Sequence, residues 1–144
     1  MWTEQITQAM AIGLAVNPQV VNNATKTTGG IDMQLSRRAI FILDIGAVTG
    51  GGSINAKLQE STDNVTFTDL AGNNVSLTGL TTANKQYTCE VRSGQLTKRY
   101  ARLSLTETGS QNVNVFAVGI GMEGNHKPNS ANNDASVATQ NVVS

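Results

Sequence analysis

The sequence predicts an all-β protein, a β-sandwich or jelly roll with extended N- and C-terminal arms. Apolar and polar residues alternate through most of the stretch from Ala39 to Ile120, for example from Ile54 to Leu58. Such alternation is typical of strands with one face on a core and the other in water. The residues from Asn125 to Ser144 show no period at all. We therefore expect an N-terminal arm at 1–24, a sandwich body at 25–123 and a C-terminal arm at 124–144.

The body contains eight segments with strand character, separated by turns rich in Gly, Asn and Asp. We predict strands at Ile31–Leu35, Ala39–Gly46, Ile54–Gln59, Val65–Leu70, Val75–Leu77, Gln86–Arg92, Arg99–Thr106 and Asn112–Ile120. A single helical turn is expected within 93–98. Many short strands at regular spacing indicate a β-sandwich or jelly roll rather than a βαβ fold. Periodicity does not reveal strand order, so both architectures stay open.

The stretch Ala39–Gly46 is the most apolar in the chain. Because both of its faces are hydrophobic, we expect a central strand that is covered on both sides. The alternation elsewhere predicts which side chains point inward. The expected core includes Ile40, Ile42, Leu58, Phe67, Val91, Leu103, Val115 and Ala117.

The N-terminal arm permits two interpretations. Ile6, Met10 and Leu14 recur every fourth residue, which favours a short helix. The segment Ala11–Val16 is equally compatible with an extended edge strand. Proline cannot continue a helix and removes a ladder donor from a sheet, so Pro18 is expected to end whichever element forms.

Composition argues against several classes of function. Lysine and arginine number 10, as do aspartate and glutamate, and only 14% of residues are charged. A neutral chain does not favour nucleic-acid binding, which depends on clustered positive charge. No apolar run approaches the ~20 residues of a membrane span. Met1–Glu4 lacks the basic region of a secretory signal, so we expect synthesis in the cytoplasm.

The chain offers few residues for chemistry. His126 is the sole histidine and lies in the patternless C-terminal arm, where no second group is expected to hold it. Cys89 is the sole cysteine and is expected to be a small buried hydrophobe. Paired carboxylates or a calcium site are conceivable at Glu60, Asp63, Asn64, Asp69 and Glu90, but solvated turns are the better interpretation. We predict no enzyme activity, no cofactor and no metal.

Residues that could contact a partner lie mainly outside the body. Trp2 is the sole tryptophan and tryptophan is a frequent interface anchor. The clustered arginines of the body are expected to be ion-pair donors to a neighbouring subunit or a solvated strand edge. The candidate interface residues are Trp2, Ile6, Met10, Arg99, Arg102, His126, Val137, Val142 and Val143.

Five segments in order along the chain resemble a family of small virion proteins of tailed bacteriophages. They are Asn22–Thr25, Arg37–Phe41, Ala56–Ser61, Thr66–Leu70 and Leu96–Arg102. Several members of that family are capsid decoration or cement proteins. The resemblance covers roughly residues 22–121 and transfers no binding or catalytic residue.

The resemblance implies a structural role on the virion. It implies a cement protein that binds the major capsid protein lattice between capsomers and stabilises the phage head. A homo-oligomer is expected, most simply a trimer at three-fold positions. Alternatives are a carbohydrate-binding β-sandwich module, which the pairing of Ala56–Ser61 with Thr66–Leu70 also resembles, and a tail or head-connector component.

The C-terminal arm has little apolar area to bury, so we expect it to be disordered alone. Its few large hydrophobes, Val137, Val142 and Val143, are spaced so that an extended strand could join the sheet edge of another subunit.

Overall fold

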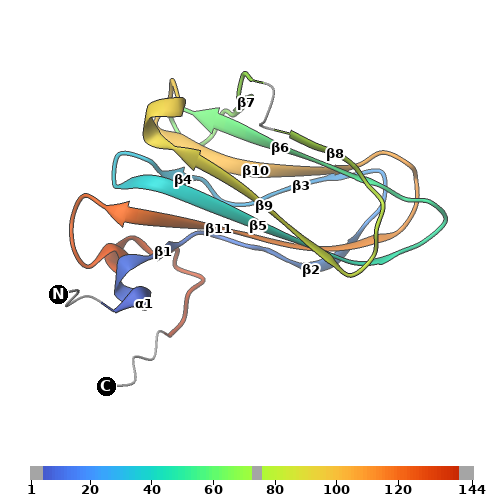
Figure 1. Cartoon of the computed structure of the whole chain (residues 1–144), viewed down its shortest axis with the longest axis horizontal. Coiled ribbons are helices and arrows are strands. Elements are labelled where there is room, and N and C mark those ends of the chain that lie inside the picture. Colours follow the sequence, from blue (N-terminus) through green and yellow to red (C-terminus); the bar gives the residue numbers. More distant parts are fainter. Residues whose placement is uncertain (1–4, 73–75, 140–144) are drawn as a thin grey trace.

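The computed structural model describes residues 5–72 and 76–139. The chain folds into two antiparallel sheets that pack face to face (Figure 1). Sheet A contains β1 (Ala11–Ile12), β2 (Val16–Val21), β5 (Ser36–Val48), β9 (Lys85–Arg92) and β11 (Val113–Gly124). Sheet B contains β3 (Thr25–Thr27), β4 (Ile31–Asp32), β6 (Ile54–Ser61), β7 (Thr68–Asp69), β8 (Ser76–Leu80) and β10 (Tyr100–Glu107). The short helices are α1 (Ile6–Ala9), η1 (Ser93–Gln95) and η2 (Asn129–Asn132). The predicted fold class, an all-β sandwich, is confirmed.

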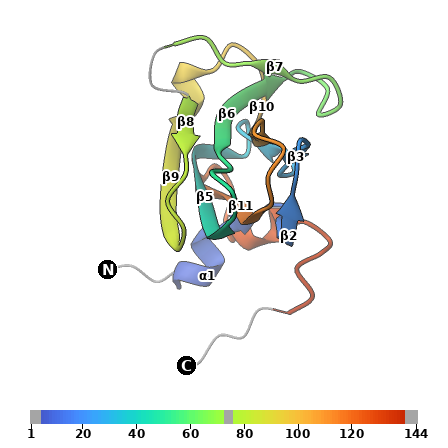
Figure 2. The same ribbon diagram turned by 90° about the vertical axis from the view of Figure 1, so that its right-hand side faces the viewer.

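The strand order identifies the sandwich as a jelly roll. β1 and β2 both pair with β11, β3 and β4 both pair with β10, and β7 and β8 both pair with β6, so each of these pairs occupies one strand position. Numbered along the chain, the positions then follow the order 1-8-3-6 in sheet A and 2-7-4-5 in sheet B. This alternation between sheets is that of an eight-stranded double Greek key. Figure 2 shows the two layers viewed along the strands.

The core lies between the two sheets and is supplied by every second residue of the long strands. β5 contributes Phe41, Leu43 and Ile45, all at most 1% exposed. Facing them from sheet B are buried side chains of β6 and β10. Five predicted core residues are confirmed: Leu58, Val91, Leu103, Val115 and Ala117 are buried.

Three predicted core residues are wrong. Ile40 and Ile42 lie on the outer face of sheet A and are only half-buried, since the odd-numbered residues of β5 point inward. With apolar residues on both faces of this strand, the sequence could not show which set faces sheet B. The third residue, Phe67, is half-exposed on the outer side of sheet B.

The N-terminal segment belongs largely to the sandwich rather than to a free arm. β2 pairs with β11 across Val16–Val21, and its ends are buried. Pro18 does not end the element, contrary to expectation. It lies where the register between β2 and β11 shifts, at an outer strand of the sheet, where a missing N–H breaks no required ladder bond. Of the stretch from Ile6 to Leu14, whose spacing favoured a helix, only α1 (Ile6–Ala9) is helical.

Local side-chain hydrogen bonds shorten two predicted strands. The Asp63 carboxylate accepts hydrogen bonds from the backbone N–H groups of Val65 and Thr66, at 2.9 and 2.8 Å, which winds the chain into a turn before β7. The Asp32 carboxylate accepts one from Gln34 N at 3.0 Å and ends β4. Aspartate favours such turns, which compete with a strand ladder.

The described part of the C-terminal arm docks on its own chain. Asp134 N donates a 2.7 Å hydrogen bond to Ile12 O, and Ile12 N donates one of 2.8 Å to Asn133 Oδ1. These bonds cover the outer edge of β1. The expectation that residues 125–139 are disordered alone is therefore wrong, and pairing of the arm with another subunit stays a prediction. The expectation considered only the small apolar area of this segment, whereas hydrogen bonds of backbone and Asn groups keep the segment in place.

Candidate interaction surface

On the outer face of sheet A the two central strands, β5 and β11, carry apolar side chains, whereas the neighbouring β9 turns Gln86, Thr88, Glu90 and Arg92 to the same face. Because side chains alternate across a strand, the even-numbered residues of β5 and β11 point away from sheet B. Cross-strand pairing places Ile40 opposite Ile120 and Ile42 opposite Val118. All four are half-buried, and Phe116 and Met122 extend the row along β11. We call this set the sheet A face: Ile40, Ile42, Phe116, Val118, Ile120 and Met122.

One end of the sheet A face is hollowed. A cavity of about 620 Å³ opens there beside β2, and its lining consists of Pro18, Gln19, Val20, Asp44, Gly46, Asn114, Val115 and Phe116. The lining is mostly apolar, and Val20 is 54% exposed. Gly46 carries no side chain to fill the space. We call this feature the β2 hollow.

The other end of the sheet A face carries a protrusion. α1 lies there, on the side of sheet A that faces away from sheet B (Figures 1 and 2), and η2 of the C-terminal segment packs beside it. The side chain of Asn129 is buried and holds this end together: its Nδ2 donates to Ala9 O at 3.3 Å and to Gly121 O at 3.1 Å. Ile6 in α1 remains 76% exposed. A large apolar side chain is thus held outward by an ordered support.

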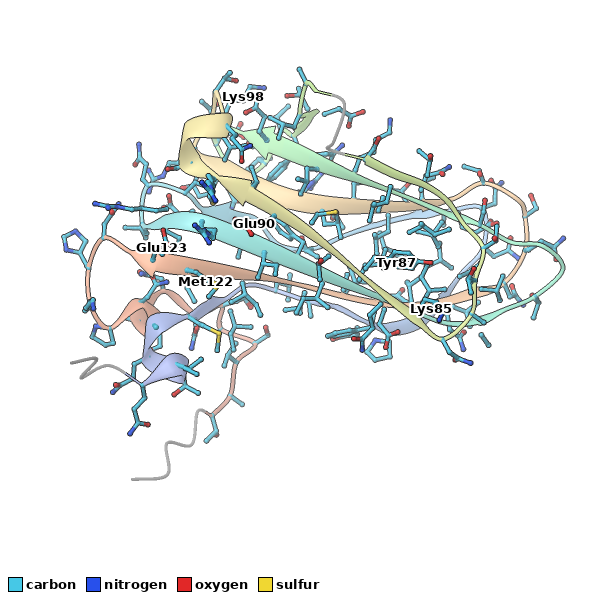
Figure 3. The ribbon with its side chains drawn as sticks, viewed as in Figure 1. Lys85, Tyr87, Glu90, Lys98, Met122 and Glu123 are labelled. Carbon is cyan, nitrogen blue, oxygen red and sulfur yellow. The ribbon has the colours of Figure 1, made fainter. Side chains whose placement is uncertain are left out.

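Charges at the rim of the sheet A face are unevenly paired. Arg38 Nη2 lies 3.4 Å from Glu123 Oε1, and its Nε lies 3.3 Å from Glu90 Oε1. That Nε is shielded from solvent and makes no hydrogen bond. Figure 3 shows Glu90 and Glu123 at the same end of the sheet. The side chain of Asp44, six residues from Arg38 along β5, makes no hydrogen bond or ion pair with the described residues.

The outer face of sheet B differs sharply, since polar side chains there pair with one another. Lys57 Nζ lies 3.0 Å from Asp69 Oδ2, and Gln59 Nε2 donates to Asp69 Oδ1 at 2.9 Å. These hydrogen bonds, from Gln59 first and then Lys57, lower the pKa of Asp69. Thr25 and Thr106 share a 2.9 Å hydrogen bond on the same face. The apolar row of β5 and β11 on sheet A therefore has no counterpart among these paired polar side chains of sheet B.

Both predicted interface arginines make contacts within the chain. Arg99 forks onto the Asp32 carboxylate, with Nη2 2.5 Å from Oδ2, and its guanidinium also lies 5.0 Å from the Tyr100 ring centroid. Arg102 lies 3.8 Å over the Phe67 ring and donates from Nε to Gln59 Oε1 at 2.9 Å. These contacts within the chain account for the positions of both side chains, with no partner protein needed. A partner role for them stays a prediction.

The other predicted interface residues scatter. Ile6 and Met10 lie at the α1 end of the sheet A face, Met10 half-buried. His126 is exposed in the turn after β11. Val137 is half-buried, and its backbone N–H donates a 3.0 Å hydrogen bond to Asp134 O. Trp2, Val142 and Val143 lie outside the described residues. Sequence reasoning missed the sheet A face, although the two-sided hydrophobicity of residues 39–46 signalled it.

The acidic residues considered for chemistry serve local structure. Burial alone would raise the pKa of Glu60, but its bonds to Thr97 and to Lys98 N lower that pKa below its ordinary value. Backbone hydrogen bonds from Thr66 and Val65 lower the pKa of Asp63 to about 2. Within the described ranges no three His, Cys, Asp or Glu side chains gather as a metal site. Cys89 points toward the core and burial raises the pKa of its thiol.

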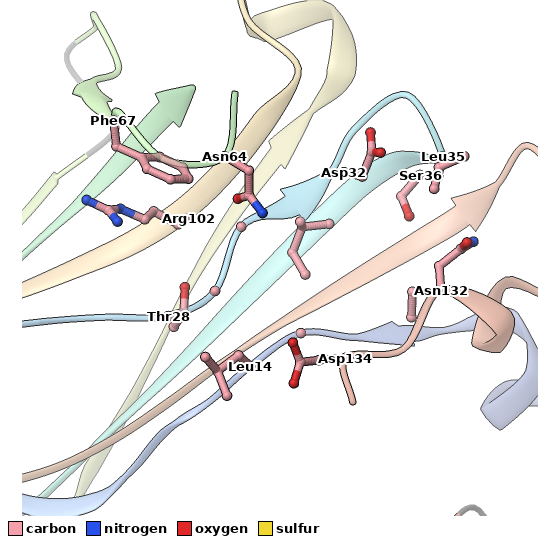
Figure 4. Close-up of a pocket in the computed structure, with 15 residues that line it drawn as sticks. Leu14, Thr28, Asp32, Leu35, Ser36, Asn64, Phe67, Arg102, Asn132 and Asp134 are labelled. Atoms are coloured by element: carbon pink, nitrogen blue, oxygen red, sulfur yellow. The ribbon is translucent and has the colours of Figure 1, made fainter. Parts of the chain in front are cut away.

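A second cavity, of about 440 Å³, opens between the 28–30 loop and the C-terminal segment (Figure 4). Its charged lining is already engaged: Asp32 with Arg99, Arg102 with Phe67, and Asp134 with the N–H of Ser136 at 2.9 Å. Asn64 and Phe67 line the cavity and pack closely against Gly30. This cavity is therefore a weaker candidate than the sheet A face. No helix of the described ranges is long and apolar enough to cross a membrane.

The fold and this surface define a jelly-roll sandwich with a half-buried apolar row on one outer face. No protein-family model matches the chain, and no curated protein matches it. Among solved structures, it is similar to a pilus protein of Bacillus endospore appendages, a family of disulfide-linked pili. The TM-score is 0.45 at 11% identity, over 85% of this chain and 96% of that chain.

Two further similar structures come from infectious bursal disease virus. They are the VP2 subviral particle, with a TM-score of 0.42 and 13% identity over 81% of this chain, and the Gt strain, with 0.44 and 13% over 84%. The chain spans about a third of those virus chains, 35% and 33%. At TM-scores below 0.5 these likenesses carry no argument about function.

Proposed function

We propose that this protein is a structural virion protein of a tailed bacteriophage, a decoration or cement protein of the capsid. Its partners are the major capsid protein and further copies of itself, and its place is the capsid surface. The proposal assigns it no catalytic role, cofactor or nucleic-acid contact. It joins the sequence resemblance described above to a jelly-roll fold that many viral capsid domains use. Fold alone does not define function, so the surface must carry the argument.

The observation that carries the proposal is the asymmetry of the two outer faces. The sheet A face presents a contiguous row of aliphatic and aromatic side chains, whereas the outer face of sheet B is polar and internally paired. Contiguous apolar patches on a soluble domain mark surfaces that contact other proteins or ligands. A sandwich with such a face is suited to permanent assembly, in which protein covers the face.

A carbohydrate-binding role is the second candidate, because lectins also use jelly rolls. Sugar platforms need aromatic rings that are open to solvent. Phe41 is fully buried, Phe67 is covered by Arg102, and Tyr100 is half-buried beside Arg99. Phe116 is half-buried on the sheet A face. The described aromatic residues therefore favour packing over a glycan platform.

Quantitative mass spectrometry of purified virions tests the proposal. A decoration protein should be present at a fixed, high ratio to the major capsid protein, and it should rebind stripped heads and raise the temperature at which they release DNA. A tail or connector component would instead occur in a few copies per particle. Absence from virions, or no effect on head stability after saturating rebinding, would reject the cement role.

A further inference from the structure

We infer that the sheet A face pairs with the same face of a second copy of this chain, as a two-fold symmetric dimer. This inference rests on the proposed function and names the protein that covers the sheet A face. The symmetry axis lies between sheet A of one copy and sheet A of the other. It runs perpendicular to the strands and crosses β5 at the level of Phe41. Sheets packed in this way stack about 10 Å apart.

Charge complementarity supports this pairing. Asp44 and Arg38 both point outward on β5, three residues to either side of Phe41. A two-fold axis at Phe41 reverses the strand direction, so Asp44 of each copy faces Arg38 of the other. Within one chain the Asp44 side chain has no partner among the described residues. Arg38 lies within 3.4 Å of both Glu90 and Glu123 of its own chain, but its Nε makes no hydrogen bond and is left to bind a further carboxylate. A carboxylate on a covered apolar face requires a cation, and the second copy supplies it.

Shape complementarity points to the same axis. β1 and β2 pair with the same side of β11, β1 near Ile120 and β2 near Asn114. The α1 protrusion and the β2 hollow therefore lie on the same side of sheet A but at opposite ends. Figure 1 shows α1 and β2 in these places. The axis that exchanges the two ends of β5 places α1 of one copy over the β2 hollow of the other. The exposed Ile6 side chain then enters an apolar cavity.

The central contacts are also matched. The same operation sets Ile40 over Ile42 of the second copy and Val118 over Ile120, so aliphatic side chains meet aliphatic side chains. Four strand positions of about eight residues span ~500 Å² in projection. Two α1 contacts at the ends bring the buried surface toward the ~800 Å² per partner of a stable interface. A self-complementary face favours a closed dimer rather than the trimer expected from capsid symmetry.

Two equally exposed apolar residues give a matched test. Ile6 is 76% exposed and Val65 79%, so neither supports the fold of the monomer, and Val65 lies in the 62–67 turn away from the sheet A face. In sedimentation equilibrium of the full chain, Ile6→Glu should raise the dimer dissociation constant at least tenfold, as loss of an interface hot spot does. Val65→Glu should leave it within about twofold of wild type.

A covalent trap tests the geometry directly. Ile6 lies in α1, beside the end of sheet A where β1 pairs with Ile120, whereas Val20 pairs with Asn114 toward the other end. A disulfide between the two positions therefore forms only between copies. The variant Ile6→Cys/Val20→Cys in a Cys89→Ser background should give a dimer on a non-reducing gel, whereas either single substitution should not.

Three results would overturn the inference. They are a wild-type monomer at the highest soluble concentration, a trimer, and a dimer that Ile6→Glu leaves intact. A monomer whose binding to capsid heads is abolished by Ile6→Glu would assign the sheet A face to the major capsid protein instead. The proposed function is decided separately, by the virion composition: a stable dimer absent from virions would uphold the inference and reject the cement role.

Discussion

Gly119 in β11 lies directly opposite Phe41 in β5, and the absence of a side chain at Gly119 makes room for the Phe41 ring. A Cβ at position 119 would lie 2.6 Å from Cε1 of that ring. The ring is fully buried and has no space to move away. Packing of the largest core side chain therefore depends on this glycine.

Gly119→Ala should lower the free energy of unfolding by about 1–3 kcal/mol through overpacking. Gly94→Ala is the matched control, because a Cβ there meets no atom within 4 Å. It should leave stability unchanged or raise it by up to ~1 kcal/mol. Urea denaturation followed by circular dichroism measures both. Equal effects at the two positions would contradict the packing described for Phe41.

Leu103→Ala should cost about 2–5 kcal/mol, because Leu103 is 1% exposed and its truncation leaves a cavity between the sheets. Ile42→Ala removes a similar side chain from the half-exposed sheet A face and should cost clearly less in the monomer. Thermal and chemical unfolding at low protein concentration compare the two. An Ile42 truncation as costly as that of Leu103 would show that the outer face is covered within one chain.

Asp63 should titrate with a pKa of about 2, because backbone N–H groups of Thr66 and Val65 and the Ser61 hydroxyl bond its carboxylate. The ordinary value is 3.8, so the folded state binds this proton less tightly than the unfolded state. The resulting stabilisation is complete above about pH 4 and is lost as the pH falls toward 2. NMR titration of the carboxyl carbon measures the pKa directly.

In Asp63→Asn the loss of stability between pH 4 and pH 2 should be smaller than in wild type. A midpoint near 4 for Asp63 in the folded protein would contradict the turn geometry.

Asn129→Ala should destabilise the protein by about 1–3 kcal/mol, because it leaves the carbonyls of Ala9 and Gly121 without their donor. It should also expose the 125–139 segment to limited proteolysis. His126→Ala, at an exposed position three residues away, should change stability by no more than ~0.5 kcal/mol. Unchanged protease sensitivity in Asn129→Ala would show that this side chain does not hold the C-terminal segment.

Arg102 and Phe67 should be energetically coupled by about 0.5–2 kcal/mol, since the guanidinium lies 3.8 Å over the ring. A double-mutant cycle with Arg102→Met and Phe67→Leu measures this coupling energy. The same cycle with Arg92→Met, at an exposed position in β9, should give a value near zero. Similar values in the two cycles would indicate no specific stacking.

Local alternation of apolar and polar residues was sufficient to predict the secondary-structure class and most strand positions. The alternation of Ile54, Ala56 and Leu58 reflects burial of one strand face, which is a local property, so β6 is recovered with only its end extended. The hydrogen bonds of Asp63 also belong to neighbouring residues, yet they shortened the strand predicted at Val65–Leu70, because side-chain turns and strand ladders compete for the same N–H groups.

Which side of β5 faces the core depends on the packing of the two sheets. Ile40, Phe41, Ile42 and Leu43 are all apolar, and only the position of sheet B distinguishes the buried pair from the half-exposed pair. Tertiary packing likewise decided the jelly-roll strand order, the docking of Asn133 and Asp134 on Ile12, and the separation of α1 from the β2 hollow. Each depends on contacts between residues far apart in the chain, which periodicity does not record.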